Sequence, residues 1–222
     1  MQIAIDGPAG AGKSTIARRL ADKLGFVYID TGAMYRCITW KAIKNEVDLA
    51  DAGQLTNLAR DTHIEFRQGS SHQLVFCDGQ DVSSAIRSHE VNAAVSKVAS
   101  HPEIRRIMVR QQQHMASNNS VVMDGRDIGE CVLPEAEYKF FLTASIEERA
   151  RRRQAELTAT GLGHELEKVK IEIEERDKSD ANREVGSLKI LPDSIVIDSS
   201  SMTIDDLMNL ILDTIRGSGY AV

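Results

Sequence analysis

Gly7-Pro8-Ala9-Gly10-Ala11-Gly12-Lys13-Ser14, followed by Thr15, fits the pattern G-x-x-x-x-G-K-S/T, which is typical of a phosphate-binding P-loop. Glycines at these positions let successive backbone N–H groups point inward at phosphate oxygens. The helix that follows adds the positive end of its dipole. We expect residues 7–15 to bind a nucleoside triphosphate, with Lys13 on its β and γ phosphates. The Ser14 hydroxyl is placed to ligate Mg²⁺.

The segments around the P-loop indicate an α/β fold. Ile3-Ala4-Ile5 is typical of a buried strand that ends in a turn, and apolar residues follow at helical spacing from Ile16 to Leu24. Further apolar runs predict strands at residues 26–29, 121–123, 138–142 and 195–197. Helical patterns lie at about 33–45, 88–100 and 103–117. Two more begin at Ser145 and Thr203, and a charged helical pattern ends at about Asp180. Because this alternation is typical of parallel sheets, we predict a five-stranded parallel sheet flanked by helices.

Two stretches depart from this alternation. Between about residues 61 and 85, period-two alternation, a turn at 68–71 and the hairpin signal Asp78-Gly79 predict a small antiparallel β insert. After Ser145, a capping-box pattern begins an arginine-rich helix that Gly161 and Gly163 interrupt. We therefore expect one core sheet with two excursions.

Composition narrows the classes of function. The 222 residues carry a formal net charge of −6, which argues against a general nucleic-acid binder. Yet ten of the seventeen arginines lie between Arg105 and Arg183, so a local site for a small anion remains open. The three cysteines form no C-x-x-C pair, the first residues lack the pattern of a signal peptide, and no 18-residue apolar stretch occurs. We expect a cytoplasmic protein that binds neither a membrane nor a nucleic-acid polymer.

A P-loop alone does not specify the reaction. A GTPase-type switch usually reads guanine through N-K-x-D, and the sequence contains no Asn-Lys pair. A small kinase should instead surround two sets of phosphates with cations, for which the planar fork of arginine is well suited. Seven arginines stand near expected strand ends or loops: Arg36, Arg126, Arg149, Arg152, Arg153, Arg176 and Arg183. A small-molecule kinase is the favoured interpretation, and a nucleotide-dependent switch is the alternative.

Three segments carry a resemblance to a known family. Asp30-Thr31-Gly32-Ala33-Met34-Tyr35-Arg36, Asp124-Gly125-Arg126-Asp127-Ile128-Gly129 and residues 175–183 (ERDKSDANR) follow the P-loop in this order. Together they resemble the bacterial cytidylate kinases, over essentially the whole chain. The resemblance implies a P-loop kinase fold and transfer of the γ-phosphoryl group of ATP to CMP or dCMP, with Mg²⁺. It also implies one domain over residues 1–222, with a monophosphate-binding insert at 61–97 and, at 145–180, an arginine-rich helical lid region and the helix that follows it. A monomer is expected.

The resemblance also assigns site residues. Lys13, Arg126, Arg176 and Arg183 match catalytic positions, and Arg149, Arg152 and Arg153 lie in the segment that resembles the ATP-side lid. The positions that match the CMP site are Thr31, Arg36, Ser96, Arg105, Arg126, Asp127, Arg176, Asp180 and Arg183.

Several of these assignments keep alternatives. Thr31 stands where the family often has Ser, and the hydroxyl is kept. Asp127 can accept from the cytosine N4 amino group while Ser96 and Arg105 donate to the acceptor edge. Taken alone, Asp127 could equally be a Mg²⁺ ligand or a cap. Asp124, which closes its strand, either contacts Mg²⁺ through water or has a structural role. Within the kinase class, UMP, AMP or shikimate is the alternative acceptor.

Overall fold

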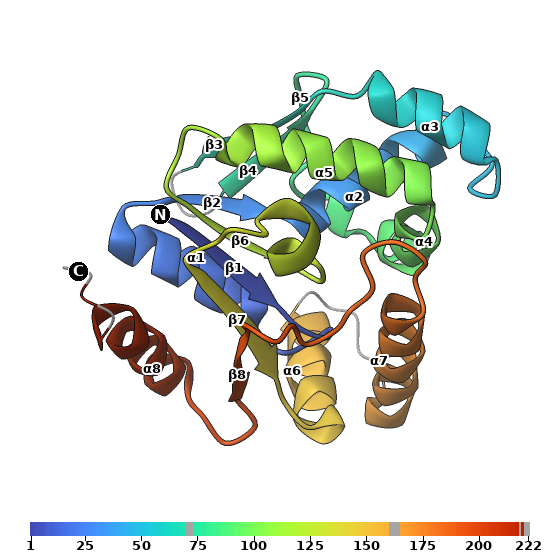
Figure 1. Ribbon diagram of the computed structural model, residues 1–222. Helices are drawn as coiled ribbons and strands as arrows, with labels where there is room; N and C mark the ends of the chain where they lie inside the picture. The colour runs from blue at the N-terminus through green and yellow to red at the C-terminus, as the bar shows by residue number, and fades with distance from the viewer. Residues whose placement is uncertain (70–72, 160–164, 218, 220–222) are drawn as a thin grey trace. The chain divides into compact units, whose positions relative to one another are not determined.

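The computed structural model describes residues 1–69, 73–159, 165–217 and 219 (Figure 1). The chain divides into two compact units. The first comprises residues 1–28 and 118–222, and the second comprises residues 29–117. The expected turn at 68–71 lies partly outside the described residues, and the expected helix break at Gly161 and Gly163 lies wholly outside them.

A five-stranded sheet has the strand order β2-β6-β1-β7-β8, and all of it except the last two residues of β2 belongs to the first unit. The pairs β1–β6, β1–β7 and β7–β8 are parallel, which confirms the predicted parallel sheet. Its strands are β1 (Gln2–Asp6), β2 (Val27–Asp30), β6 (Val121–Gly125), β7 (Tyr138–Thr143) and β8 (Ile195–Asp198). In the β1–β6 register Asp6 lies opposite Gly125, so the segments that leave these two strands start side by side.

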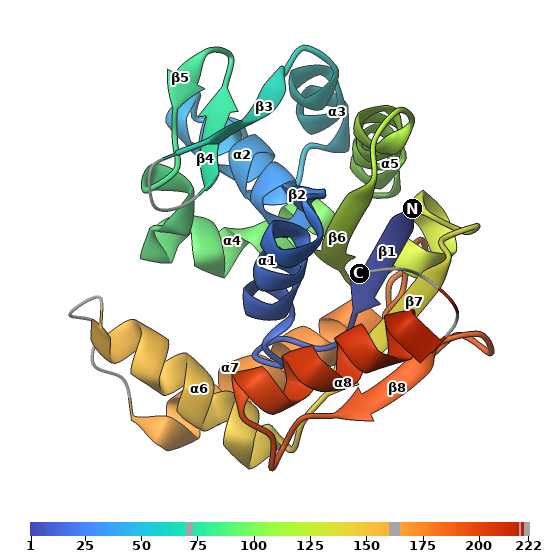
Figure 2. The ribbon, with the colours of Figure 1, turned by 90° about the vertical axis from the view of Figure 1, so that its left-hand side faces the viewer.

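Helices α1 and α8 share one hydrophobic core with the sheet. Buried side chains of the two helices, such as Leu20 and Ile211, pack with Ile5 and Leu142 of the strands. In Figure 2, α1 lies to the left of β6 and β1, and α8 lies below α1. The helices of the unit are α1 (Lys13–Leu24), α6 (Ile146–Ala159), α7 (Leu166–Ala181), α8 (Ile204–Gly217) and the short π-helix η2 (Ile128–Val132). The Ser145 Oγ accepts from the Glu148 N–H, as the capping-box pattern predicted.

The second unit combines four helices and one 3₁₀ turn with a three-stranded antiparallel sheet, among the residues that the structure describes. Strand β4 pairs antiparallel with both β3 and β5, which confirms the predicted insert. The strands are β3 (Ile64–Gln68), β4 (Gln73–Cys77) and β5 (Gln80–Asp81). The helices are α2 (Thr31–Lys44), α3 (Ala52–Arg60), η1 (Ala85–Arg87), α4 (His89–Ala99) and α5 (Pro102–Ala116).

Helix α3 was not expected from the sequence. The Asp51 side chain caps it by accepting from the Gln54 N–H at 2.9 Å. The helix has nine residues, of which Leu55, Thr56 and Ala59 are buried. An apolar stripe this short gives too little periodic signal to identify a helix in advance.

None of the described helices is long and apolar enough to cross a membrane. The three cysteines, Cys37, Cys77 and Cys131, form no disulfide bond.

We predict that the shared core of α1, α8 and the sheet dominates the stability of the first unit. Leu20 is fully buried in this core, whereas Leu210 on α8 is 43% exposed. Leu20→Ala should lower the free energy of unfolding by about 2–5 kcal/mol, because it removes buried methyl groups and leaves a cavity. Leu210→Ala, the matched control, should lower it by less than about 1 kcal/mol. Urea unfolding checks both values, and equal losses would contradict the assignment of this core.

Candidate functional site

The P-loop leaves β1 through a glycine that no other residue can replace without strain. Gly7 has φ +147°, and a Cβ atom built there would lie 2.0 Å from the carbonyl oxygen of Leu142 on the neighbouring strand β7. The close approach of two backbones therefore excludes a side chain at this position. The sequence pattern required glycine here, and the structure gives the steric reason.

Lys13 begins α1 at the end of the P-loop and is 5% exposed. Its Nζ donates to the carbonyl oxygen of Pro8 at 2.7 Å, so the ammonium is held within the loop itself. Burial lowers the pKa of Lys13 well below its usual range, and the neighbouring positive charges of Arg126 and Arg176 lower it further. The carboxylates of Asp124 and Asp180 oppose these effects. Lys13 thus belongs to a crowded group of charges in the first unit.

Ser14, the residue after Lys13, forms a hydrogen bond with Asp124 at the end of β6. The Ser14 Oγ donates to Asp124 Oδ2 at 2.7 Å, and the Tyr28 hydroxyl donates to Asp124 Oδ1 at 2.8 Å. Hydroxyl and carboxylate oxygens are ligands that Mg²⁺ accepts. No group of three His, Cys, Asp or Glu side chains that could hold a metal occurs among the residues described. Ser14 and Asp124 therefore fit Mg²⁺ that takes its remaining ligands from phosphates and water.

A buried carboxylate gathers the arginines that follow β6 and α7. Asp180 has a side chain only 1% exposed, and it accepts from Arg126 Nε at 2.6 Å and from Arg183 Nη2. Burial by itself raises the pKa of Asp180, but the charges of Arg126, Arg183 and Arg176 outweigh it and hold that pKa below its usual value. The structure therefore brings together four of the predicted site residues: Arg126, Arg176, Asp180 and Arg183.

Arg149 reaches the P-loop from α6. Its Nε donates to the carbonyl oxygen of Ala144 at 3.0 Å, and its Nη1 donates to the carbonyl oxygen of Ala9 at 3.1 Å. Asp177 of α7 pairs with the same guanidinium and accepts from the Ala9 N–H at 3.2 Å. Asp177 was not among the expected site residues, although it lies within the motif at 175–183 that carries the resemblance.

The two other arginines of α6 have different surroundings. Arg152 donates to Glu148 at 2.9 Å and to the carbonyl oxygen of Ser199 at 2.7 Å. A Cβ atom built at Gly12 would lie 3.8 Å from Arg152 Nη1, so this guanidinium is a neighbour of the P-loop. Arg153 pairs with Glu156 one turn along the same helix. The expected contact of Arg153 with ATP stays a prediction.

The second unit holds the other predicted residues except Asp127. Thr31 begins α2 and is buried, and the Nε of Arg36 donates to Asn92 Oδ1 of α4 at 3.3 Å. Arg105 of α5 is 1% exposed, and its Nη1 donates to the carbonyl oxygen of Ala99 at 3.2 Å. Its guanidinium carbon lies 5.3 Å from the centre of the Tyr35 ring, within the range of a cation–π contact. Ser96 lies half-buried on α4.

Asp127 belongs to the first unit and is 6% exposed. The residue directly after it begins η2, and the first two N–H groups of that helix, from Ile128 and Gly129, donate to the carboxylate of Asp6. Burial raises the pKa of Asp6 to about 6, even though these two hydrogen bonds lower it. Asp6 was not among the residues singled out from the sequence.

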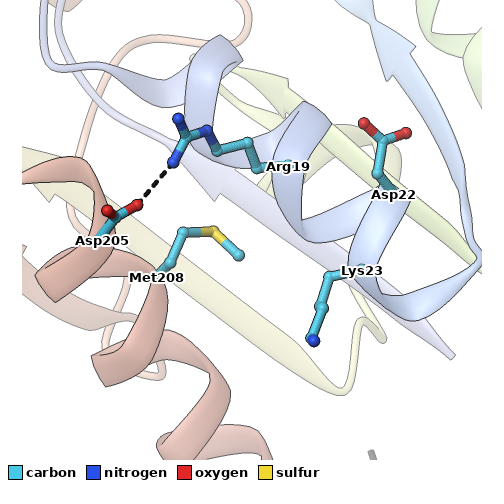
Figure 3. A pocket seen from close by; sticks show the side chains of 5 residues that line it. All are labelled: Arg19, Asp22, Lys23, Asp205 and Met208. Atoms are coloured by element: carbon cyan, nitrogen blue, oxygen red, sulfur yellow. Dashed lines mark hydrogen bonds and ion pairs between the residues drawn. The ribbon is translucent and has the colours of Figure 1, made fainter.

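A hollow of about 450 Å³ lies along α1 beyond the P-loop (Figure 3). Arg19, Asp22 and Lys23 of α1 line it together with Asp205 and Met208 of α8. Arg19 donates to Asp205 at 2.8 Å. The hollow has two cationic side chains, Arg19 and Lys23, and two anionic ones, Asp22 and Asp205, so the formal charges of its lining cancel. This balance does not match a triphosphate, and the P-loop with its neighbouring cations remains the candidate site.

Comparison with known proteins assigns the family. The family model described as "Cytidylate kinase" matches residues 3–217. The chain belongs to the cytidylate kinase family. It is 50% identical to the cytidylate kinase of Geobacillus sp. (strain WCH70) over 216 aligned residues. The aligned region covers 97% of this chain and 96% of the relative. It is also 50% identical to the cytidylate kinase of Bacillus cereus (strain ATCC 10987 / NRS 248) over 217 aligned residues, which are 98% of this chain and 96% of the relative.

Membership of the cytidylate kinase family makes the protein a kinase, a transferase that binds nucleotides. Among solved structures, an uncharacterized protein from Eubacterium ventriosum ATCC 27560 has a TM-score of 0.53 at 13% identity, with 98% of both chains covered. At that identity the likeness concerns the fold alone. It agrees with the parallel sheet and flanking helices described above.

We predict that Gly7→Ala is more damaging than alanine at another glycine with positive φ. Gly25 has φ +67° and open space around the position of its missing Cβ, so Gly25→Ala should cost about 1–2 kcal/mol of stability from backbone strain alone. Gly7→Ala adds a collision with the Leu142 carbonyl and should cost about 3 kcal/mol or more. Thermal unfolding followed by circular dichroism compares the two variants. Similar losses would show that the contact with β7 is not the constraint.

Proposed function

We propose that the protein transfers the γ-phosphoryl group of ATP to CMP or dCMP and releases CDP or dCDP. The observation that carries the proposal is the group of cations around Asp180 and Lys13, in a chain that belongs to the cytidylate kinase family. Two phosphate-rich substrates need such a concentration of positive charge in a protected site. The total charge of −6 does not oppose this, because the local field decides nucleotide binding.

On the donor side, the backbone of residues 7–15 holds the phosphates of ATP. Lys13 exchanges its hydrogen bond with the Pro8 carbonyl for phosphate oxygens. Arg149 and Arg152, which lie next to Ala9 and Gly12, add charge near the same loop. Ser14 would ligate Mg²⁺ directly and Asp124 through water. When bound, the ion neutralises charge on the triphosphate and orients it.

Transfer needs no covalent enzyme intermediate. The attacking oxygen of the CMP phosphate is already anionic, so no strong general base is required. Charge spreads over the oxygens of the transferred group, and Lys13, Arg126, Arg176 and Arg183 stabilise it. The pairing of Arg126 and Arg183 with Asp180 restricts their side chains before the substrate arrives. Closure of the lid region excludes water, which would otherwise compete as acceptor.

On the acceptor side, Arg36, Arg126 and Arg183 hold the CMP phosphate, and Thr31 contributes a hydroxyl. Arg176 and Asp180 contact phosphate and ribose. Asp127 accepts from the N4 amino group of cytosine, while Ser96 and Arg105 donate to its N3 and O2 edge. Uracil presents O4 instead of the amino group and would leave the carboxylate unpaired, which disfavours UMP.

The same proposal treats residues 1–222 as one catalytic domain in which the segment 61–97 serves the monophosphate. We propose a cytoplasmic monomer that acts on free nucleotides and on no nucleic-acid polymer.

The acceptor preference tests the proposal directly. ADP release is measured with ATP and, in turn, CMP, dCMP, UMP, AMP and shikimate. CMP and dCMP should give a kcat/KM at least about tenfold above the others, because hydrogen-bonding sites reject analogues that leave buried groups unpaired. Equal or higher turnover with UMP or AMP would overturn the proposed base recognition. Slow hydrolysis that no acceptor accelerates would instead indicate a nucleotide-dependent switch.

The carboxylate of Asp127 should determine the preference for cytosine. Asp127→Ala should lower the ratio of kcat/KM for CMP to that for UMP by about 10- to 100-fold, since it removes an acceptor matched only to the N4 amino group. The KM for ATP should stay within about twofold. Glu130→Ala is the matched control, because it removes a nearby carboxylate that pairs with Lys189. An unchanged CMP preference in Asp127→Ala would show that Asp127 does not read the base.

A further inference from the structure

Asp6 is a buried carboxylate that the proposed chemistry does not use. It occupies the last position of β1, directly before the P-loop residue Gly7, and is 7% exposed. One of its oxygens accepts from the Ile128 N–H at 2.9 Å, and the other accepts from the Gly129 N–H at 2.8 Å. These bonds join positions more than 120 residues apart in the sequence. The start of the P-loop and the segment after Asp127 are therefore tied by one side chain.

The two N–H groups belong to the first turn of η2 and need an acceptor from outside it. The first N–H groups of a helix have no partner within the helix, and burial without a partner is costly. Within the segment, the Cys131 N–H donates to the Asp127 carbonyl at 2.8 Å, and the Leu133 N–H donates to the Ile128 carbonyl at 2.7 Å. These local bonds shape the turn. The bonds to Asp6 fix its position relative to the sheet.

The sheet register places Asp6 where it can control this segment. Asp6 lies opposite Gly125, the last residue of β6, so Arg126 and Asp127 leave the sheet directly beside it. The direction in which the chain turns after Asp127 then depends on the acceptor that receives the next two N–H groups. A shift of this backbone moves the Asp127 carboxylate with it.

The charge of Asp6 suits this role near neutral pH. Burial and, to a smaller extent, the charge of Asp127 raise its pKa, while the two N–H groups and Lys13 lower it, and the net result is a pKa of about 6. Above that pKa the carboxylate is ionised, and both oxygens accept hydrogen bonds. Such charge-assisted bonds are stronger than neutral ones.

We propose that Asp6 is a positioning residue for base recognition, which fixes the backbone after Asp127 and thereby sets the discrimination between cytosine and uracil. This inference rests on the proposed function, in which Asp127 reads the base. Asp6 itself contacts no substrate atom in this account. It acts through the peptide groups of Ile128 and Gly129.

The test compares Asp6→Asn with the wild-type protein. Asparagine keeps the shape of the side chain but turns one acceptor oxygen into an NH₂ group, which faces a backbone donor. The ratio of kcat/KM for CMP to that for UMP should fall about tenfold, the factor that the loss of one such bond represents. The KM for ATP should change by less than about twofold. A residue with only a structural role would lower the melting temperature and leave the base ratio unchanged.

Asp206→Asn is the matched control. Asp206 Oδ2 accepts from the Thr203 N–H at 3.1 Å at the start of α8, so this variant also weakens a carboxylate bond to a backbone donor beside a helix. It should leave the CMP:UMP ratio unchanged. If Asp6→Asn does not fold, the ratio is measured for Asp6→Glu, which keeps the charge but displaces it by one methylene. An unchanged ratio in a folded Asp6 variant would overturn the inference.

The failure of this inference can be separated from failure of the proposed function. If Asp127→Ala loses discrimination and Asp6→Asn keeps it, Asp127 reads the base without help from Asp6. If the wild-type protein shows no preference for CMP over UMP, the proposed function fails first. Equal rises of the KM values for ATP and CMP in Asp6→Asn also overturn the inference, because they indicate a general disturbance of the P-loop.

Discussion

The cluster of charged side chains at the candidate site of the first unit depends on the buried carboxylate of Asp180. Arg126 and Arg183 both donate to it, and Arg176 contributes to the charge around it. In a buried setting, cations that lie close together repel one another strongly unless an anion separates them. Asp180 supplies that anion and so holds the arginines together at the candidate site. Without this carboxylate, each arginine added to the cluster would raise its electrostatic energy by repelling the others.

The parallel sheet explains why these groups meet. Neighbouring strands β1 and β6 run in the same direction, and their carboxyl ends lie side by side, with Ile5 opposite Asp124 and Asp6 opposite Gly125. The P-loop leaves from one of these ends, and the segment with Arg126 and Asp127 leaves from the other. Ligand sites in open α/β sheets form at this edge. The hydrogen bond between Ser14 of the P-loop and Asp124 of β6 joins the ends of these two strands.

Much of this arrangement could be predicted from sequence, because its signals are local. Apolar runs identified all five strands of the parallel sheet, and the G-K-S pattern identified the P-loop. The roles of Asp6 and Asp177 could not be predicted in the same way. Asp6 accepts from two backbone N–H groups and Asp177 from one, all more than 120 residues away, and a backbone donor leaves no residue type to recognise. Helix α3 could not be predicted from the sequence because its stripe of buried residues is short.

The strand order has a consequence for the order of folding. β1 is the central strand of the sheet, yet its partners β6 and β7 begin at Val121 and Tyr138. During synthesis from the N-terminus, residues 29–117 emerge before either partner exists and can complete their own compact unit. Until β6 and β7 have been made, the apolar residues of β1 and α1 lack their contacts with these strands. Such long-range pairing slows folding, and it leaves these apolar residues without their sheet partners throughout that interval.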